Sequence, residues 1–218
     1  MRTLTEGTTR TVDADAPVAR PYKLAHLVIR TARLAEMRAF YLDVLGAEVV
    51  SEHEGLYCGM TYDEEHHRLA LVAIPEAPTT DAGSTFSAGV LNNNEDTDLG
   101  DLAFSASPGL EHVAFTYATL SELVHTYVRL REHGITPAFC VNHGPTVSLY
   151  YEDPDANKVE LQIDSMTLDA ADEYLRSEVA LENVIGWPFD PEDLVRRFEA
   201  GEPINELALG IGKPDSGA

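Results

Sequence analysis

Cysteine and basic residues are both scarce in this sequence of 218 residues. The two cysteines, Cys58 and Cys140, fall in separate predicted strands, and a chain with so few more often buries them as small hydrophobic side chains than joins them in a disulfide. Lysine and arginine total 15 against 37 acidic residues, which gives a formal net charge of −22. Nucleic acids and anionic membrane surfaces attract basic proteins, so we expect neither as a partner.

Long hydrophobic runs are also missing. No apolar stretch approaches the roughly 20 residues that a membrane helix needs. Residues 1–17 lack the apolar centre of a secretion signal, so we expect a cytoplasmic protein. Residues 1–20 are polar, rich in threonine and without periodicity, which predicts a flexible N-terminal arm.

The sequence does contain an internal repeat. Residues 23–41, KLAHLVIRTARLAEMRAFY, align without a gap on residues 109–127, GLEHVAFTYATLSELVHTY, at a constant offset of 86 (112 − 26). Such a repeat indicates one supersecondary unit used twice. His26 and His112 are therefore equivalent, each on the first strand of its unit.

The hydrophobic pattern predicts a strand, a helix and three further strands in each unit. The first module, 22–76, holds a strand that carries His26, a helix at 34–46 and strands at 47–55, 56–63 and 67–75. The second module, 109–166, holds a strand at 109–118, a helix at 120–134, a strand at 135–144 and two strands within 148–164. We expect an α+β fold, in which two βαβββ modules form one curved mixed sheet within a single domain at 21–166.

The remaining segments have a different composition. Residues 77–108 are rich in Asn, Asp and Gly, and a connection of this length is often functional or disordered; we expect it to cover one end of the site. Residues 167–218 predict a helical C-terminal extension, with one helix opened by Asp190-Pro191 and a frayed end.

Glu160 is a candidate functional residue on the last strand of the second module. Strand alternation places Glu160 and Gln162 on the face opposite Val159 and Leu161. A carboxylate there either faces solvent or meets the histidine of the first strand. Taken alone, each histidine is more often a structural residue; the repeat and Glu160 together favour a site.

Two βαβββ units with histidines on their first strands and a glutamate on the last resemble the vicinal oxygen chelate (glyoxalase/bleomycin resistance/dioxygenase) superfamily. Within it, the chain most resembles the single-domain type I extradiol catechol dioxygenases. The resemblance implies that His26, His112 and Glu160 bind the metal, with Fe(II) as the cofactor and Mn(II) as the alternative ion.

Three further matches extend this resemblance. HHRLAL resembles the family's His-x-x-Ala-Leu segment and implies His67 as the acid–base residue. YYEDPDANKVE resembles the segment that carries the family's active-site tyrosine, here Tyr150, and the His-Gly pair before it implies His143 near dioxygen, with a spacing that departs by two residues. Ala156 replaces the usual glycine of the turn, so either Asn157 is left-handed or the turn is of another type.

The implied chemistry is extradiol cleavage of a catechol by dioxygen. Two histidines and one carboxylate on one face of an octahedral ion leave three positions for two catechol oxygens and dioxygen. His67 would remove and return a proton, a task that suits a side chain titrating near neutral pH. Tyr150 and His143 would donate hydrogen bonds to oxygen atoms.

Other members of the superfamily are the alternatives. One is a lyase, isomerase or thiol transferase that uses Mn, Zn or Ni; another is a non-catalytic small-molecule binding protein. Glyoxalase-like members take a ligand from the last strand of both modules, but residues 69–75, LALVAIP, offer none. The identity of the catechol stays open, and edge strands leave a homodimer or higher homo-oligomer open as well.

Overall fold

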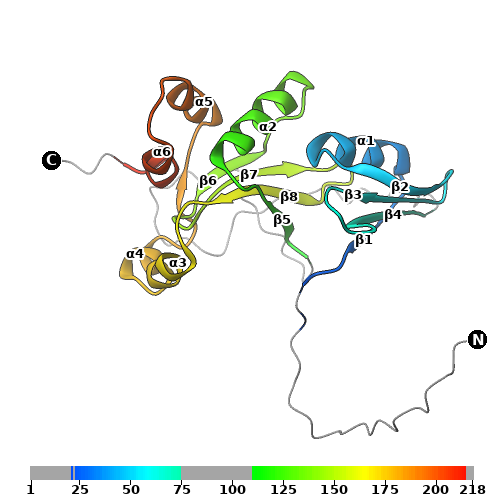
Figure 1. Cartoon of the computed structure of the whole chain (residues 1–218), viewed down its shortest axis with the longest axis horizontal. Helices are drawn as coiled ribbons and strands as arrows, with labels where there is room; N and C mark the ends of the chain where they lie inside the picture. Colours follow the sequence, from blue (N-terminus) through cyan, green and yellow to red (C-terminus); the bar gives the residue numbers. More distant parts are fainter. Residues whose placement is uncertain (1–20, 22, 75–109, 215–218) are drawn as a thin grey trace, which may run out of the picture.

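The computed structural model describes residues 21, 23–74 and 110–214 (Figure 1). The expected arm at 1–20 and the expected covering role of the 77–108 connection lie outside the described residues. The division into an arm, one two-module domain and an extension stays a prediction.

The first module forms a four-stranded sheet with one helix. Its elements are β1 (Leu27–Thr31), α1 (Leu34–Val44), β2 (Glu48–His53), β3 (Tyr57–Thr61) and β4 (Leu69–Ala73). The strand order is β1-β4-β3-β2, with β1 and β4 parallel and the other pairs antiparallel. Helix α1 buries the apolar stripe formed by Met37, Phe40, Tyr41 and Val44, as its helical spacing predicts.

The second module repeats this arrangement. Its elements are β5 (His112–Thr116), α2 (Leu120–Glu132), β6 (Phe139–Asn142), β7 (Thr146–Glu152) and β8 (Lys158–Asp164). The strand order begins β5-β8-β7-β6, and β5 runs parallel to β8. A capping box between Thr119 and Glu122 satisfies free backbone N–H groups at the start of α2.

The expected α+β fold of two βαβββ modules is confirmed, with one difference of detail. Within the described residues each module has its own mixed sheet, and no ladder joins them into a single sheet. The modules meet through side chains instead: one hydrophobic cluster contains Met37 and Val44 of α1 together with Leu123 and Val124 of α2. Figure 1 shows α1 and α2 on the same side of the two sheets.

The turn between β7 and β8 contains Ala156 where the family usually has glycine. Ala156 itself adopts the left-handed conformation, with φ 63°. Asp153 stabilises this turn, because its Oδ1 accepts hydrogen bonds from the backbone N–H of Asp155 (3.0 Å) and of Asn157 (2.8 Å). Of the two alternatives, a left-handed Asn157 is therefore excluded and the turn is of another type. The side chain of Asp153 holds the backbone in a conformation that alanine otherwise disfavours.

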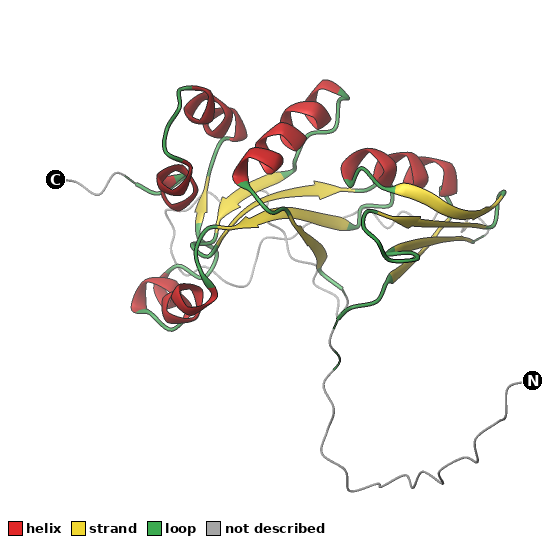
Figure 2. Cartoon of the chain, viewed as in Figure 1, coloured by secondary structure: helices red, strands yellow, loops and turns green. Residues whose placement is uncertain are grey.

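The C-terminal extension adds helices and one short strand. Its elements are α3 (Leu168–Leu175), α4 (Glu178–Glu182), β9 (Trp187–Pro188), α5 (Pro191–Glu199) and α6 (Ile204–Gly210). Strand β9 pairs with β6 and so extends the second sheet. Helices α3 and α4 lie on the side of this sheet opposite α2 and α5 (Figure 2).

Two expectations for the extension and the cysteines have clear outcomes. The expected fraying is wrong for residues 204–211, because α6 forms and Leu207, Ala208 and Ile211 are buried; residues 215–218 lie outside the described residues. Cys58 and Cys140 are free and buried, as expected. In the part of the chain that the structure describes, no helix has the length and apolar character to cross a bilayer.

Candidate active site

The second module brings His112 and Glu160 together. His112 begins β5, and Glu160 lies on the neighbouring parallel strand β8, opposite Ala114. His112 Nε2 lies 3.1 Å from Glu160 Oε2. Glu160 is only 4% exposed, so the solvent-facing alternative for this carboxylate is excluded.

Hydrogen bonds keep the buried Glu160 carboxylate ionised. Burial alone would raise its pKa, but hydrogen bonds with His112, Ser148 and Tyr150 outweigh that effect and lower it. The same contact with Glu160 raises the pKa of His112, against the opposing effect of partial burial. The two groups therefore form a charge-assisted pair.

Tyr150 links Glu160 to His143. Tyr150 lies opposite Glu160 in the β7–β8 ladder, and its hydroxyl lies 3.0 Å from His143 Nε2. Burial, followed by the Glu160 charge, raises the pKa of Tyr150, so its hydroxyl stays protonated at neutral pH. His112 also packs edge-on against the Tyr150 ring, with 5.4 Å between ring centroids.

The C-terminal extension fixes the tautomer of His143. His143 Nδ1 lies 2.6 Å from the carbonyl oxygen of Ile185, and a carbonyl can only accept, so Nδ1 carries a proton. Burial lowers the pKa of His143 although this hydrogen bond opposes the effect. The neutral imidazole therefore presents an unprotonated Nε2, which competes with Glu160 for the single proton of the Tyr150 hydroxyl.

Close packing of the extension against the turn after β6 supports this placement. Gly144 has φ 97°, and a Cβ there would lie 2.4 Å from the ring of Tyr174 on α3. A Cβ on Gly186 would lie 2.2 Å from the carbonyl oxygen of Asn142. Neither position has room for a side chain, so the His143 segment and the extension fit each other closely.

His26 and His67 form a second group in the first module. Their ring centroids lie 4.5 Å apart, and His67 Nδ1 lies 2.6 Å from His66 Nδ1. His26 is exposed and immediately precedes β1. Partial desolvation, then the neighbouring His26 and His66, lowers the pKa of His67, which favours its neutral form.

The six predicted site residues thus fall into two groups: Glu160, His112, Tyr150 and His143 in one, His26 and His67 in the other. Among the described residues, no three His, Cys, Asp or Glu side chains are close enough to hold an ion together. His26 does not join His112 and Glu160 in such a group, and the three-residue ligand set stays a prediction.

The donor atoms of His112 and Glu160 nevertheless fit a metal site. Two atoms that bind one octahedral ion at right angles, each about 2.1 Å from it, lie about 3 Å apart. The observed separation of His112 Nε2 and Glu160 Oε2 is 3.1 Å. A nitrogen and a buried carboxylate oxygen at this spacing are suitable ligands for Fe(II) or Mn(II).

The register of the two sheets explains why only one module offers a carboxylate. Val28 pairs with Ala70 in the first sheet, and the equivalent Ala114 pairs with Glu160 in the second. Ala70 therefore occupies the position of Glu160. The first module has no fourth ligand at this place, as the sequence of β4 predicts.

Sequence reasoning missed two groups of this site. Ser148 is buried and hydrogen-bonds Glu160; it lies two residues before Tyr150, so strand alternation would have placed both on one face. The Ile185 carbonyl, which holds His143, is a backbone group, and its role leaves no signal in the residue type.

The fold and this site define a class of protein. Residues 23–161 match the Glyoxalase/Bleomycin resistance protein/Dioxygenase superfamily, and the chain belongs to this superfamily. It is 41% identical over 186 residues to "Biphenyl-2,3-diol 1,2-dioxygenase 3" of Rhodococcus globerulus, covering 85% of this chain and 86% of the relative. It is 39% identical to "Biphenyl-2,3-diol 1,2-dioxygenase 2" of the same organism, with the same coverage.

Solved structures with a similar fold include a lyase and a fosfomycin resistance protein. Lactoylglutathione lyase from Agrobacterium tumefaciens has a TM-score of 0.46 and 20% identity, and the match covers 66% of this chain and 96% of the lyase. The fosfomycin resistance protein FosX from Mesorhizobium loti has a TM-score of 0.45 and 14% identity, with coverage of 70% and 98%. At these identities the likeness concerns the fold alone.

Proposed function

We infer that this chain is an extradiol ring-cleaving dioxygenase that opens a catechol-type ring beside its two hydroxyl groups. The observation that carries this inference is the 41% identity, over 85% of the chain, to a biphenyl-2,3-diol 1,2-dioxygenase. The buried pair of His112 and Glu160 supports it. An aryl-substituted catechol, with biphenyl-2,3-diol as the first to test, is the proposed substrate, and dioxygen is the second.

His26, His112 and Glu160 would hold the metal ion. Two imidazoles and one carboxylate form the donor set of non-haem iron(II) oxygenases, so Fe(II) is the proposed cofactor and Mn(II) the alternative. When bound there, Fe(II) supplies one kind of chemistry, the passage of electron density from the substrate oxygens to dioxygen. A cytoplasmic location and a homo-oligomer belong to the same proposal.

The protein's own side chains would manage protons and orientation. His67, with a lowered pKa, is neutral at neutral pH and can take a proton from a catechol hydroxyl and later return it. The Tyr150 hydroxyl carries one proton, and with substrate bound it can donate that proton to a substrate oxygen in place of Glu160 or His143. The hydrogen bond from His143 to Ile185 keeps that imidazole in one orientation beside Tyr150, which lowers the cost of arranging the site.

Oxygen uptake tests this function. The protein would be reconstituted with Fe(II) without air and mixed with biphenyl-2,3-diol, catechol or 3-methylcatechol in an oxygen electrode. We expect one dioxygen per substrate and a yellow ring-opened product, with loss of both in His112→Ala and Glu160→Ala. The exposed His53 on β2 provides the control, since His53→Ala should retain activity. No uptake by fully metal-loaded protein across the panel would contradict the proposal.

A further inference from the structure

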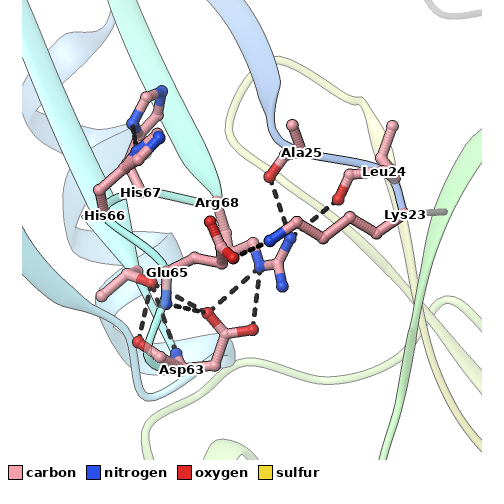
Figure 3. A network of polar contacts seen from close by, with 9 residues as sticks. Lys23, Leu24, Ala25, Asp63, Glu65, His66, His67 and Arg68 are labelled. Atoms are coloured by element: carbon pink, nitrogen blue, oxygen red, sulfur yellow. Dashed lines mark hydrogen bonds and ion pairs between the residues drawn. The ribbon is translucent and has the colours of Figure 1, made fainter. Parts of the chain in front are cut away.

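Arg68 holds the backbone on both sides of His26. Its Nη1 donates to the carbonyl oxygens of Leu24 (2.8 Å) and Ala25 (3.0 Å), the two residues before the histidine (Figure 3). Its own carbonyl oxygen accepts from the backbone N–H of Leu27, the residue after it, at 2.9 Å. One residue therefore fixes the chain immediately before and after His26.

Asp63 fixes the guanidinium of Arg68 in turn. Arg68 Nε lies 2.9 Å from Asp63 Oδ2 and 3.2 Å from Oδ1. Asp63 is itself held, because its Oδ1 accepts from the backbone N–H of Glu65 at 3.0 Å. The Arg68 side chain is 19% exposed and its contact with Asp63 is partly buried, whereas its hydrogen bonds to Leu24 and Ala25 are exposed.

The second module has a counterpart at the same position. Leu27 pairs with Leu69 in the first sheet, and the equivalent Val113 pairs with Val159 in the second. Lys158, which precedes Val159, therefore corresponds to Arg68, which precedes Leu69. Lys158 forms an ion pair with Glu111, the residue before His112. In both modules a basic residue thus contacts the residue immediately before the histidine, through its backbone carbonyl in Ala25 and through its side chain in Glu111.

The first module depends on this contact more than the second. His112 is the first residue of β5 and pairs with Lys158 in the ladder. His26 precedes β1 and is exposed, as are residues 23–25. Ladder hydrogen bonds therefore do little to restrict the backbone of His26, and the side chain of Arg68 supplies part of that restriction.

We propose that Arg68 and Lys158 are positioning residues, which hold His26 and His112 in the orientation that metal binding requires. This proposal rests on the proposed function, since it takes both histidines as metal ligands. Neither basic residue would touch the ion. Groups that hydrogen-bond a metal-binding side chain directly change metal affinity about 10- to 100-fold when they are removed. Arg68 and Lys158 act through the residue before each histidine, so we expect changes at the lower end of that range.

Anaerobic calorimetric titration with Fe(II) alone measures the effect without relying on catalysis. We expect Arg68→Met to raise the Kd for Fe(II) about 10-fold, and Lys158→Met and Asp63→Asn to raise it as well. Arg68→Lys should fall between wild type and Arg68→Met, because one ammonium group cannot reach Asp63 and both carbonyls. Arg176→Met, which removes the exposed Arg176–Asp172 pair on α3, is the control and should leave the Kd unchanged.

His26→Ala and His112→Ala separate this proposal from the proposed function. If both bind Fe(II) with the wild-type Kd, the ligand assignment itself fails. If both lose binding while folded Arg68→Met and Lys158→Met keep the wild-type Kd, the positioning role is overturned and the ligand assignment stands. If circular dichroism shows that Arg68→Met does not fold, Arg68→Lys and Asp63→Asn test the positioning role of Arg68 instead. A wild-type Kd for Fe(II) in both variants overturns that role.

Discussion

Tyr41 and Tyr127, which occupy matching positions on α1 and α2, each donate a hydrogen bond to a carboxylate of the unit that follows. Tyr41 Oη lies 2.9 Å from Asp153 Oδ2 in the second module. Tyr127 Oη lies 2.6 Å from Glu192 Oε1 in the C-terminal extension. Equivalent residues of the internal repeat therefore make equivalent contacts, because each tyrosine hydrogen-bonds its module to the segment that follows it.

The buried Tyr41 hydroxyl lowers the free energy of unfolding as the pH rises above about 10. Burial, then the charge and hydrogen bond of Asp153, raises the pKa of Tyr41. Its unfolded-state pKa is about 10, so above that pH the unfolded chain releases a proton that the native state keeps. The stabilisation is complete below pH about 10 and falls as pH rises, by up to about 1.4 kcal/mol per pH unit for this one group.

The variant Tyr41→Phe isolates this contribution. We expect its unfolding free energy to be lower than that of wild type at pH 8, because Asp153 loses a donor, and to fall less steeply between pH 10 and 11. Urea titrations at several pH values measure both quantities. Parallel pH profiles for the two proteins would contradict the assignment.

Adjacent tyrosines on β7 allow a matched test of the site. The hydroxyl of Tyr150 contacts His143 and Glu160, and we expect Tyr150→Phe to lower kcat about 100-fold, a typical effect of removing one active-site donor. Tyr151 is buried in the core, and within the described residues its hydroxyl has no hydrogen-bond partner. Tyr151→Phe should therefore keep kcat and raise stability by about 1 kcal/mol. Equal kcat in the two variants would rule out the role of Tyr150.

Asn142 connects the end of α6 with the turn that follows β6, next to His143, through hydrogen bonds of its side chain. Its Nδ2 donates to the carbonyl oxygens of Ala208 (3.2 Å) and Ile211 (2.9 Å), and its Oδ1 accepts from the backbone N–H of Gly144 at 2.9 Å. Asn142→Ala leaves these buried groups unpaired and should lower the unfolding free energy by about 2–4 kcal/mol. Urea denaturation measures this, and a loss below about 0.5 kcal/mol would show that the contacts contribute little.

The left-handed Ala156 predicts a stabilising substitution. This conformation costs a residue with a Cβ about 1 kcal/mol, whereas glycine adopts it without that cost. Ala156→Gly should raise the unfolding free energy by about 0.5–1 kcal/mol despite the greater entropy of the unfolded chain. Ala171→Gly, inside helix α3, should lower it by a similar amount. The same sign of change in both variants would show that Ala156 is not strained.

Periodicity and the repeat predict most of the fold. The helix at 34–46 appears as Leu34–Val44, and the helix opened by Asp190-Pro191 begins at Pro191 with Asp190 as its cap. The end of the chain is different. Helix α6 is short, and Leu207 and Ile211 become buried only because α6 packs against α5. Such tertiary burial does not appear in the local pattern.

The candidate site is predictable where it depends on side chains at strand positions. Glu160 and Tyr150 meet because the β7–β8 register pairs them, and strand alternation anticipates the face of Glu160. The Ile185 carbonyl comes from a segment 42 residues away from His143, and the Arg68 contacts go to backbone carbonyls. Contacts between distant segments that use backbone atoms depend on the folded geometry and not on residue type.

The most direct test of the account is a crystal structure of the protein loaded with Fe(II) without air, with anomalous scattering recorded at the iron edge. The account predicts one iron per chain, bound by His26, His112 and Glu160, with Tyr150 and His143 beside its open positions. Iron bound elsewhere, or bound without His26 while that ring stays against His67, would contradict it.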